Sequence, residues 1–262
     1  MPGRSLLIEA VSSSQLMDSG SQVVFCDFDG PIVDVSERYY RTYRQGLLAI
    51  AASCQREENV CLAIAPLSKS QFWQKKQHRV ADSEIALHSG VPAEWFEPYM
   101  QQVERLVNHT SLLRWDQIQP SAKSALLYLK QSRMRLVLVT LRHPRQVNAF
   151  LQEQAIAHLI DDVYGASTVS AAHENRTDHK CKLLATAIEQ QQAKGYGTTH
   201  SWMIGDTEAD VLAAKSMGLP SAALACGIRS SDYLRSLEPT EMYSELFSAA
   251  RAIVATSRLQ VA

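Results

Sequence analysis

The chain has 262 residues, of which 46% are hydrophobic, and a formal net charge of -1. This length allows one large or two modest domains, and a near-neutral charge without a long basic block argues against a nucleic-acid partner or a membrane surface. The apolar runs fall short of the roughly 18 residues that a transmembrane helix needs, and scattered cysteines without a Cys-x-x-Cys pair predict a reducing, cytoplasmic setting rather than a disulfide framework or a zinc site.

The first twenty residues carry no element that we expect to pack. Their short apolar patch, Leu6 to Ile8, is interrupted by Glu9 and does not resemble a secretory signal. We predict that residues 1–20 are a loosely ordered lead-in.

The first strong element is the apolar run from Val23 to Cys26, which is followed by Asp27, Asp29 and Gly30. A short apolar run bounded by turn residues is typical of a buried strand. Side chains two positions apart on an extended chain point the same way, so Asp27 and Asp29 are expected to converge beyond the strand, where α/β sheets place ligands. Two converging carboxylates call for a metal or a lysine. A plain loop between strands is the alternative for this stretch alone.

Helical periodicity dominates the next part of the chain. Apolar residues recur at three- and four-residue intervals after Ser36, a candidate N-cap, and again from Phe96; Ser68 with Gln71 resembles a capping box. We predict an inserted helical cap over residues 35–113, with residues 21–34 and 114–262 forming the core. Ordinary packing of these helices against the core is the alternative.

Strands and helices then alternate. The expected strands are 136–140, 162–165, 202–204 and 221–225, and the expected helices are 121–131, one from near 144, 177–193, 208–217 and 241–259. This alternation predicts an α/β fold with a doubly wound parallel sheet. Thr140 ends the second strand, a position that by itself predicts no more than a strand end or a helix cap.

Two later segments add charges to the same predicted sheet edge. At 100° per residue Lys180 falls on the apolar side of its helix, whereas Lys182 falls opposite, so an inward Lys180 needs an anion to meet. Asp206 follows an apolar strand, and Asp210, four residues on, shares its helical face. An N-cap with acidic residues in the first helical turn is the competing interpretation.

Together these segments resemble the four motifs of the haloacid dehalogenase superfamily, in particular its phosphatase branch with a helical cap after the first strand, which includes phosphoglycolate phosphatase-like proteins. The resemblance runs from about residue 22 to about residue 229 and agrees in order and spacing. It implies a Rossmann-like core with a helical cap. The matching residues, in motif order, are Asp27-Phe28-Asp29-Gly30, Thr140, Lys180 and Gly205-Asp206-x-x-x-Asp210.

The resemblance also implies a Mg²⁺-dependent phosphatase that acts on a small phosphorylated metabolite through an aspartyl phosphate. Asp27 is the implied nucleophile, and Asp29 is implied to protonate the leaving oxygen and then to activate water. The implied phosphate ligands are Thr140 and Lys180. The implied Mg²⁺ ligands are the Asp27 carboxylate, the Asp29 backbone carbonyl, Asp206 and, directly or through water, Asp210, a set that suits a cation preferring oxygen.

Some residues depart from the family pattern or receive no role. Pro31 stands where most relatives have a residue with an N–H, so a turn that needs this donor would be impaired. Arg142 and His143 place cationic groups directly after Thr140. Contact with substrate and exposure to solvent are both open as explanations for them. In the cap, Lys75 and Lys76 fit an exposed helix face more readily than a Schiff-base lysine.

Other functions fit the same fold. A phosphomutase uses the same core and stays open as an alternative. A dehalogenase needs no metal and is disfavoured by Asp29 and the acidic fourth motif. A non-catalytic binding or scaffold protein would have no need to retain every charged position.

Overall fold

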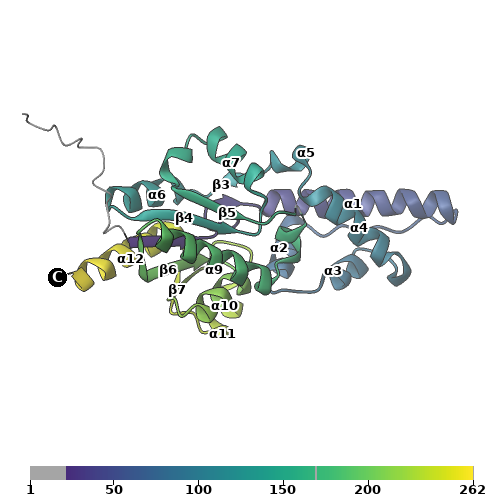
Figure 1. Ribbon diagram of the computed structural model, residues 1–262. Helices are drawn as coiled ribbons and strands as arrows, with labels where there is room; N and C mark the ends of the chain where they lie inside the picture. Colours follow the sequence, from purple (N-terminus) through teal and green to yellow (C-terminus); the bar gives the residue numbers. More distant parts are fainter. Residues whose placement is uncertain (1–21, 169, 262) are drawn as a thin grey trace, which may run out of the picture.

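The computed structural model describes residues 22–168 and 170–261, so the predicted lead-in over residues 1–20 lies outside the described part of the chain (Figure 1). No helix in the described ranges is long and apolar enough to cross a membrane. The strands of the main sheet are β1 (Gln22–Cys26), β4 (Arg135–Thr140), β5 (Asp162–Gly165), β6 (Gly197–Gly205), β7 (Ser221–Leu224) and β8 (Glu241–Tyr243).

The six strands form one sheet in the order β5-β4-β1-β6-β7-β8, and every neighbouring pair is parallel. β1 lies inside the sheet, where Val24 is opposite Leu136 of β4 and Trp202 of β6. Both faces of β1 are buried, as is usual for a strand covered by helices on two sides. The predicted doubly wound parallel sheet is confirmed.

Helices cover both faces of this sheet (Figure 1). Val23 and Phe25 pack in the cluster that contains Leu184 and Ala213, whereas Val24 packs in the cluster that contains Leu126. The core helices are α6 (Ala122–Gln131), α7 (Pro144–Glu153), η2 (Ala157–Leu159), α8 (Ala171–Glu174), α9 (Thr177–Ala193), α10 (Glu208–Ser216), α11 (Ser231–Ser236) and α12 (Leu246–Val261).

A helical region is inserted between β1 and β4 and extends beyond one end of the sheet (Figure 1). Two chain segments connect this region to the core, and they pair with each other as β2 and β3, an antiparallel pair in which Val33 is opposite Ile118. The insertion is confirmed, and residues 35–113 remain the bounds that we propose for it. Its helices are α1 (Ser36–Glu57), α2 (Lys69–Gln77), α3 (Asp82–His88), η1 (Ala93–Trp95), α4 (Phe96–Val107) and α5 (Thr110–Leu113), and the short strands β2 (Val33–Asp34) and β3 (Gln117–Ile118) lie just outside these bounds.

Two local predictions need correction. Ser36 is the first residue of α1, whose N-cap is Val35, and the Ser36 N–H donates a 2.8 Å hydrogen bond to Asp34 Oδ1. The expected helix over 241–259 begins later, at Leu246, because Glu241–Tyr243 adds β8 in parallel to β7. The capping box of Ser68 and Gln71 is confirmed.

Candidate active site

Three neighbouring strands bring the predicted site residues to one edge of the sheet. Asp27 follows β1, Thr140 ends β4 and Asp206 follows β6, and the Asp27 N–H still donates to the Ile204 carbonyl at 2.8 Å. Because the strands are parallel, their carboxyl ends lie at the same edge. Asp27, Thr140 and Asp206 are all buried there.

Lys180 lies inside the protein near the start of α9, as its helical position predicts. Its side chain is 1% exposed, and its Nζ lies 2.9 Å from Asp27 Oδ1 and 2.7 Å from Asp210 Oδ1. Burial opposes its charge, but Asp210 and Asp27 outweigh burial and raise the pKa of Lys180. Lys182 is exposed. Lys180 is therefore a buried ammonium that joins two carboxylates.

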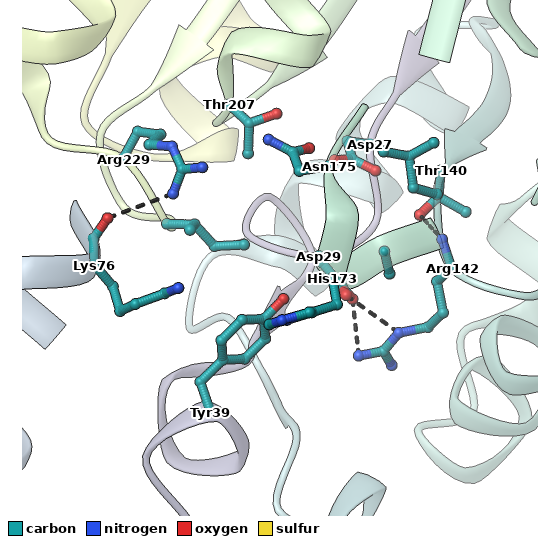
Figure 2. A pocket seen from close by; sticks show the side chains of 13 residues that line it. Asp27, Asp29, Tyr39, Lys76, Thr140, Arg142, His173, Asn175, Thr207 and Arg229 are labelled. Carbon is teal, nitrogen blue, oxygen red and sulfur yellow. Dashed lines mark hydrogen bonds and ion pairs between the residues drawn. The ribbon is translucent and has the colours of Figure 1, made fainter. Parts of the chain in front are cut away.

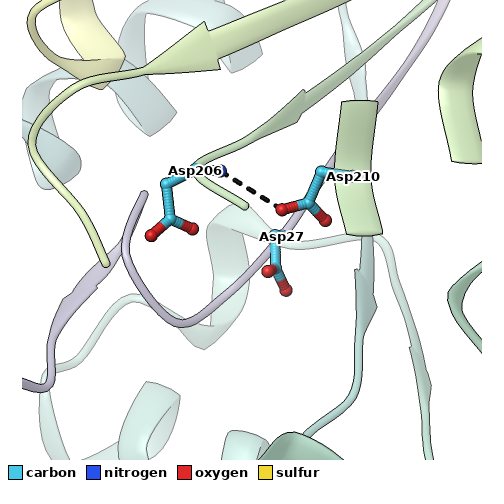
Figure 3. A group of neighbouring side chains, drawn as sticks. All are labelled: Asp27, Asp206 and Asp210. Atoms are coloured by element: carbon cyan, nitrogen blue, oxygen red, sulfur yellow. Dashed lines mark hydrogen bonds between the residues drawn. The ribbon is translucent and has the colours of Figure 1, made fainter. Parts of the chain in front are cut away.

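The carboxylates of Asp27, Asp206 and Asp210 form a cluster in which one oxygen from each lies within 4.8 Å of the other two (Figure 3). Burial, and then the charges of Asp210 and Asp27, raise the pKa of Asp206 well above its usual range. Burial and Asp210 raise the pKa of Asp27 to about 7, although Lys180 acts in the opposite direction. Asp206 Oδ1 is buried and has no hydrogen-bond partner. The cluster thus has more negative charge than one ammonium balances, and its oxygens suit a divalent cation.

Backbone groups fix two of these carboxylates. The Ile228 N–H donates to Asp206 Oδ2 at 2.5 Å. Asp210 Oδ2 accepts bonds from the backbone N–H groups of Asp206 and Thr207 and a 2.8 Å bond from the Thr207 hydroxyl. The N-cap interpretation of this segment is therefore correct, and the same carboxylate still presents its other oxygen to Lys180.

These carboxylates occupy space that is free because three neighbouring residues are glycines without a Cβ. A Cβ at Gly30 would lie 2.1 Å from Asp206 Cγ, and a Cβ at Gly227 would lie 2.0 Å from Asp206 Oδ2. A Cβ at Gly205 would lie 2.2 Å from Asp210 Cγ. Gly30 also has a φ of +96°, which disfavours other residues. The Asp-Gly and Gly-Asp pairs of the sequence thus serve the packing of the cluster.

Asp29 points elsewhere than predicted. β1 ends at Cys26, so the chain is no longer extended at Asp29, whose Oδ2 lies 3.2 Å from Arg38 Nη2 and from Arg142 Nε. Asp27 and Asp29 consequently have separate cations instead of a shared one. Both still line one cavity.

This cavity has a volume of about 50 Å³ and opens between the sheet edge and α2 (Figure 2). Thr140 and His173 line it from the core, and Lys76 lines it from the inserted helices. The expectation of an exposed face is wrong for Lys76, whose side chain is 14% exposed and pairs with Asp82 at 2.8 Å.

The arrangement matches a known family over most of the chain. A family model described as haloacid dehalogenase-like hydrolase matches residues 23–224, from β1 to the end of β7. The chain belongs to this family. The matched range of this haloacid dehalogenase-like hydrolase includes the inserted helices and the whole carboxylate cluster.

Two curated relatives of this hydrolase are phosphatases by name. A phosphoglycolate phosphatase of Vibrio cholerae is 28% identical over 144 residues, which cover 55% of this chain and 57% of that protein. The chain thus matches little more than half the length of this relative. Probable phosphatase IndB of Dickeya dadantii is 28% identical over 240 residues, which cover 90% of this chain and 96% of that protein.

Solved structures share the fold of this hydrolase at low sequence identity. A predicted phosphatase from Clostridium acetobutylicum has a TM-score of 0.63 and 17% identity, with 90% of this chain and 98% of that chain covered. Protein tyrosine kinase A of Mycobacterium tuberculosis also has a TM-score of 0.63, with 18% identity and 89% and 97% coverage. Likeness at this level concerns the fold alone, because one fold carries different activities.

Pro31 does not disturb the turn in this haloacid dehalogenase-like hydrolase. The Gly30 N–H donates to the Val33 carbonyl at 2.8 Å, and the N–H groups of Ile32 and Val33 both donate to the Phe28 carbonyl at 3.1 Å. These bonds close the turn with donors on either side of position 31. The missing N–H of proline therefore removes none of them.

Sequence reasoning missed Arg38 and Asp116 near Asp29 and left Arg142 open between substrate contact and solvent exposure. Arg142 is buried, so the solvent-exposed alternative is wrong for it. Arg38, Asp116 and Arg142 are all buried and form ion pairs with Asp29 or with one another. Neither Arg38 nor Asp116 had a usable sequence signal, because the burial of Arg38 in α1 appears only in the structure and Asp116 lies in a short connection between α5 and β3.

Gly227→Ala is expected to weaken Mg²⁺ binding by this hydrolase by about tenfold or more, the usual range for changes next to metal ligands. The added Cβ would overlap Asp206 Oδ2 and displace that carboxylate. Isothermal titration with Mg²⁺ measures the effect. Gly197→Ala is the matched control, because a Cβ there meets nothing within 4 Å. Equal affinities of Gly227→Ala and the wild type would contradict the proposed part of Asp206 in the site.

Proposed function

We propose that this hydrolase is a Mg²⁺-dependent phosphatase that cleaves a small organic phosphate monoester through an aspartyl phosphate on Asp27. The observation that carries the proposal is the position of Asp27. Its carboxylate lines the cavity, contacts the buried Lys180 ammonium and adjoins the carboxylates of Asp206 and Asp210, so that three carboxylates share this one ammonium. The Lys180 ammonium would balance the charge of a phosphoryl group there, and the carboxylates would bind a divalent cation.

The residues present fit Mg²⁺. Asp206 Oδ1 is buried without a hydrogen-bond partner, and the cluster offers the hard oxygen donors that Mg²⁺ prefers. Asp27, Asp206 and the Asp29 backbone carbonyl would hold the ion, with Asp210 in direct or water-mediated support. When bound, Mg²⁺ neutralises phosphate charge and the repulsion among these carboxylates.

The chain's own residues would carry two steps. Asp27 attacks phosphorus, and the Asp29 carboxyl gives its proton to the departing ester oxygen as the bond from phosphorus to that oxygen breaks. Asp29 then takes a proton from water as the water oxygen bonds to phosphorus and the bond to Asp27 breaks, which releases phosphate. Thr140 and Lys180 contact the phosphoryl oxygens and balance their charge.

The cavity supports a compact substrate. It is small, about 50 Å³, and lies directly against Asp27 and Thr140. At the cavity wall Lys76 pairs with Asp82, and Arg229 pairs with Glu208 at 2.7 Å, so these cations are already partnered. The relative from Vibrio cholerae is named for phosphoglycolate, which makes this compact ester the first substrate to test.

Phosphate release from a panel of small esters, with and without Mg²⁺, tests the proposal. We expect Mg²⁺-dependent turnover by the wild type, and a rise of the unfolding midpoint with Mg²⁺ because the ion binds the folded state alone. Asp206→Asn should lose both responses. Turnover that is independent of metal would contradict the proposal, and transfer of phosphate between sugar phosphates without release would identify a phosphomutase.

A further inference from the structure

Every charged side chain that lines the catalytic cavity in the described part of the chain already has a partner of opposite charge. These pairs are Asp27 with Lys180, Arg142 with Asp29, Lys76 with Asp82 and Arg229 with Glu208. Arg229 holds Glu208 with two hydrogen bonds, of 2.7 Å from Nε and 3.0 Å from Nη2. A ligand carboxylate at Lys76 or Arg229 would therefore also meet the acid that each cation already holds.

Tyr39 on α1 brings to this cavity a hydroxyl that packing does not explain. Its ring lies edge-on to Trp73, with the two centroids 6.3 Å apart, and 5.1 Å from the guanidinium carbon of Arg38. A phenylalanine would keep both contacts. The hydroxyl makes no hydrogen bond to any described residue, and Figure 2 shows it directed into the cavity. Burial raises the pKa of Tyr39 to about 12, so the hydroxyl stays protonated and can both donate and accept.

His173 in α8 lies on the same side of the cavity. Tyr39 and His173 both also line a second cavity, of about 20 Å³, among the inserted helices. The ring nitrogens of His173 make no hydrogen bond within the described ranges, and Nδ1 is buried. Burial, and then the charge of Lys76, lower the pKa of His173, so its imidazole is neutral and has one donor and one acceptor nitrogen.

The other uncharged polar side chains of the cavity have separate explanations. Thr140 stands at the phosphoryl end, and the Thr207 hydroxyl donates to Asp210 at 2.8 Å. Asn175 ends α8 with a φ of +47°, a conformation that asparagine adopts more readily than most residues. The free hydrogen-bonding capacity that remains is therefore uncharged and belongs to Tyr39 and His173.

We propose that Tyr39 and His173 bind a hydroxyl group of the leaving alcohol, and that the substrates are phosphate monoesters of small polyols. The inference rests on the proposed function, in which Asp27 takes the phosphoryl group from such an ester. A ligand hydroxyl can donate to one of these side chains and accept from the other, which satisfies polar groups that the protein leaves unpaired. A carboxylate can only accept, and it would add negative charge to a cavity lined by Asp27 and Asp29.

Esters with the same three-carbon frame test this preference. Glycerol 3-phosphate carries a hydroxyl on each of its other two carbons, and propyl phosphate carries none. In 3-phosphoglycerate a carboxylate replaces the terminal hydroxymethyl group. A site built for a hydroxyl rejects ligands that lack one, because its polar groups are then left unpaired. In Mg²⁺ we expect the wild-type kcat/KM for glycerol 3-phosphate to exceed those for the other two esters by at least about tenfold.

Variants assign the preference to the two side chains. Tyr39→Phe should lower kcat/KM for glycerol 3-phosphate by about three- to tenfold, the scale of one uncharged hydrogen bond, and leave that for propyl phosphate within about twofold. Tyr40→Phe is the matched control, because the Tyr40 hydroxyl donates to the Leu67 carbonyl at 3.1 Å and does not line the cavity. His173→Gln, which keeps a donor and an acceptor, should retain more of the preference than His173→Leu.

Two results would overturn the inference. One is a wild-type preference for 3-phosphoglycerate or phosphoglycolate over glycerol 3-phosphate. The other is a Tyr39→Phe variant that loses nothing on glycerol 3-phosphate, or that loses equally on glycerol 3-phosphate and propyl phosphate. Absence of Mg²⁺-dependent phosphate release from every ester with the wild type would instead overturn the proposed function.

Discussion

Asp27→Asn is expected to lower Mg²⁺-dependent phosphate release by about 10⁴-fold or more, the scale on which removal of a nucleophile acts. Asparagine keeps the size of the side chain but has no carboxylate oxygen to attack phosphorus. Lys180 keeps its second partner, Asp210, at 2.7 Å. The loss therefore reflects chemistry, and steady-state release of phosphate from the best ester of the panel measures it.

Stability measurements separate this loss from unfolding. Burial raises the folded-state pKa of Asp27 from its ordinary value of 3.8 to about 7. Between pH 3.8 and about pH 7 the folded protein therefore keeps a proton on Asp27 that the unfolded chain has lost. The contribution of Asp27 to stability falls as the pH rises through this range. Above pH 7 and without Mg²⁺, the free energy of unfolding of Asp27→Asn should be no lower than that of the wild type.

A trapped phosphoenzyme gives the sharpest comparison. Asp29→Asn keeps the nucleophile, so acid quenching after mixing with acetyl phosphate should trap a phosphorylated chain. Asp27→Asn should give none. Turnover by Asp27→Asn within about tenfold of the wild type would contradict the assignment of the nucleophile.

Lys180→Met is expected to lower the free energy of unfolding by about 3–5 kcal/mol, the usual cost of removing one partner from a buried ion pair. Lys180 is 1% exposed and meets both Asp27 and Asp210. Methionine fills similar space but leaves the carboxylates without their ammonium. Denaturation in urea at pH 8 without Mg²⁺ measures the change.

The neighbouring lysine provides the control. Lys182 lies two residues on in the same helix and is exposed, so Lys182→Met should change stability by no more than about 0.5 kcal/mol. Added Mg²⁺ should restore part of the loss in Lys180→Met, because a second cation would meet the same carboxylates. Equal small losses in the two variants would show that the buried charges are balanced by other means.

Local patterns were sufficient for much of the fold and for part of the candidate site. A short apolar run bounded by turn residues predicted β1, and helical periodicity predicted α9 and distinguished the inward Lys180 from Lys182. Asp27 and Asp206 were predictable as neighbours, because parallel strands end at one edge of the sheet. These predictions depend on residues close in sequence or on a general rule of topology.

Contacts between distant segments were not predictable in the same way. Asp29 lies beside Asp27 in the sequence motif, yet its side chain direction is determined by Arg38 and Arg142 after the chain turns at Gly30. Asp116 is 78 positions from Arg38. β8 was missed for a similar reason, since three residues become a strand through pairing with β7 rather than through their own pattern.

The place of β1 in the sheet has a consequence for synthesis on the ribosome. Val24 is paired with Leu136 and Trp202, so a growing chain leaves both edges of this apolar strand open until β4 emerges and one edge open until β6 emerges. Pairings so distant in sequence slow folding and prolong the exposure of strand edges that aggregate. The nascent protein is thus most vulnerable to aggregation while the helical insertion is being translated, and the carboxylate cluster cannot assemble before β6 has left the exit tunnel.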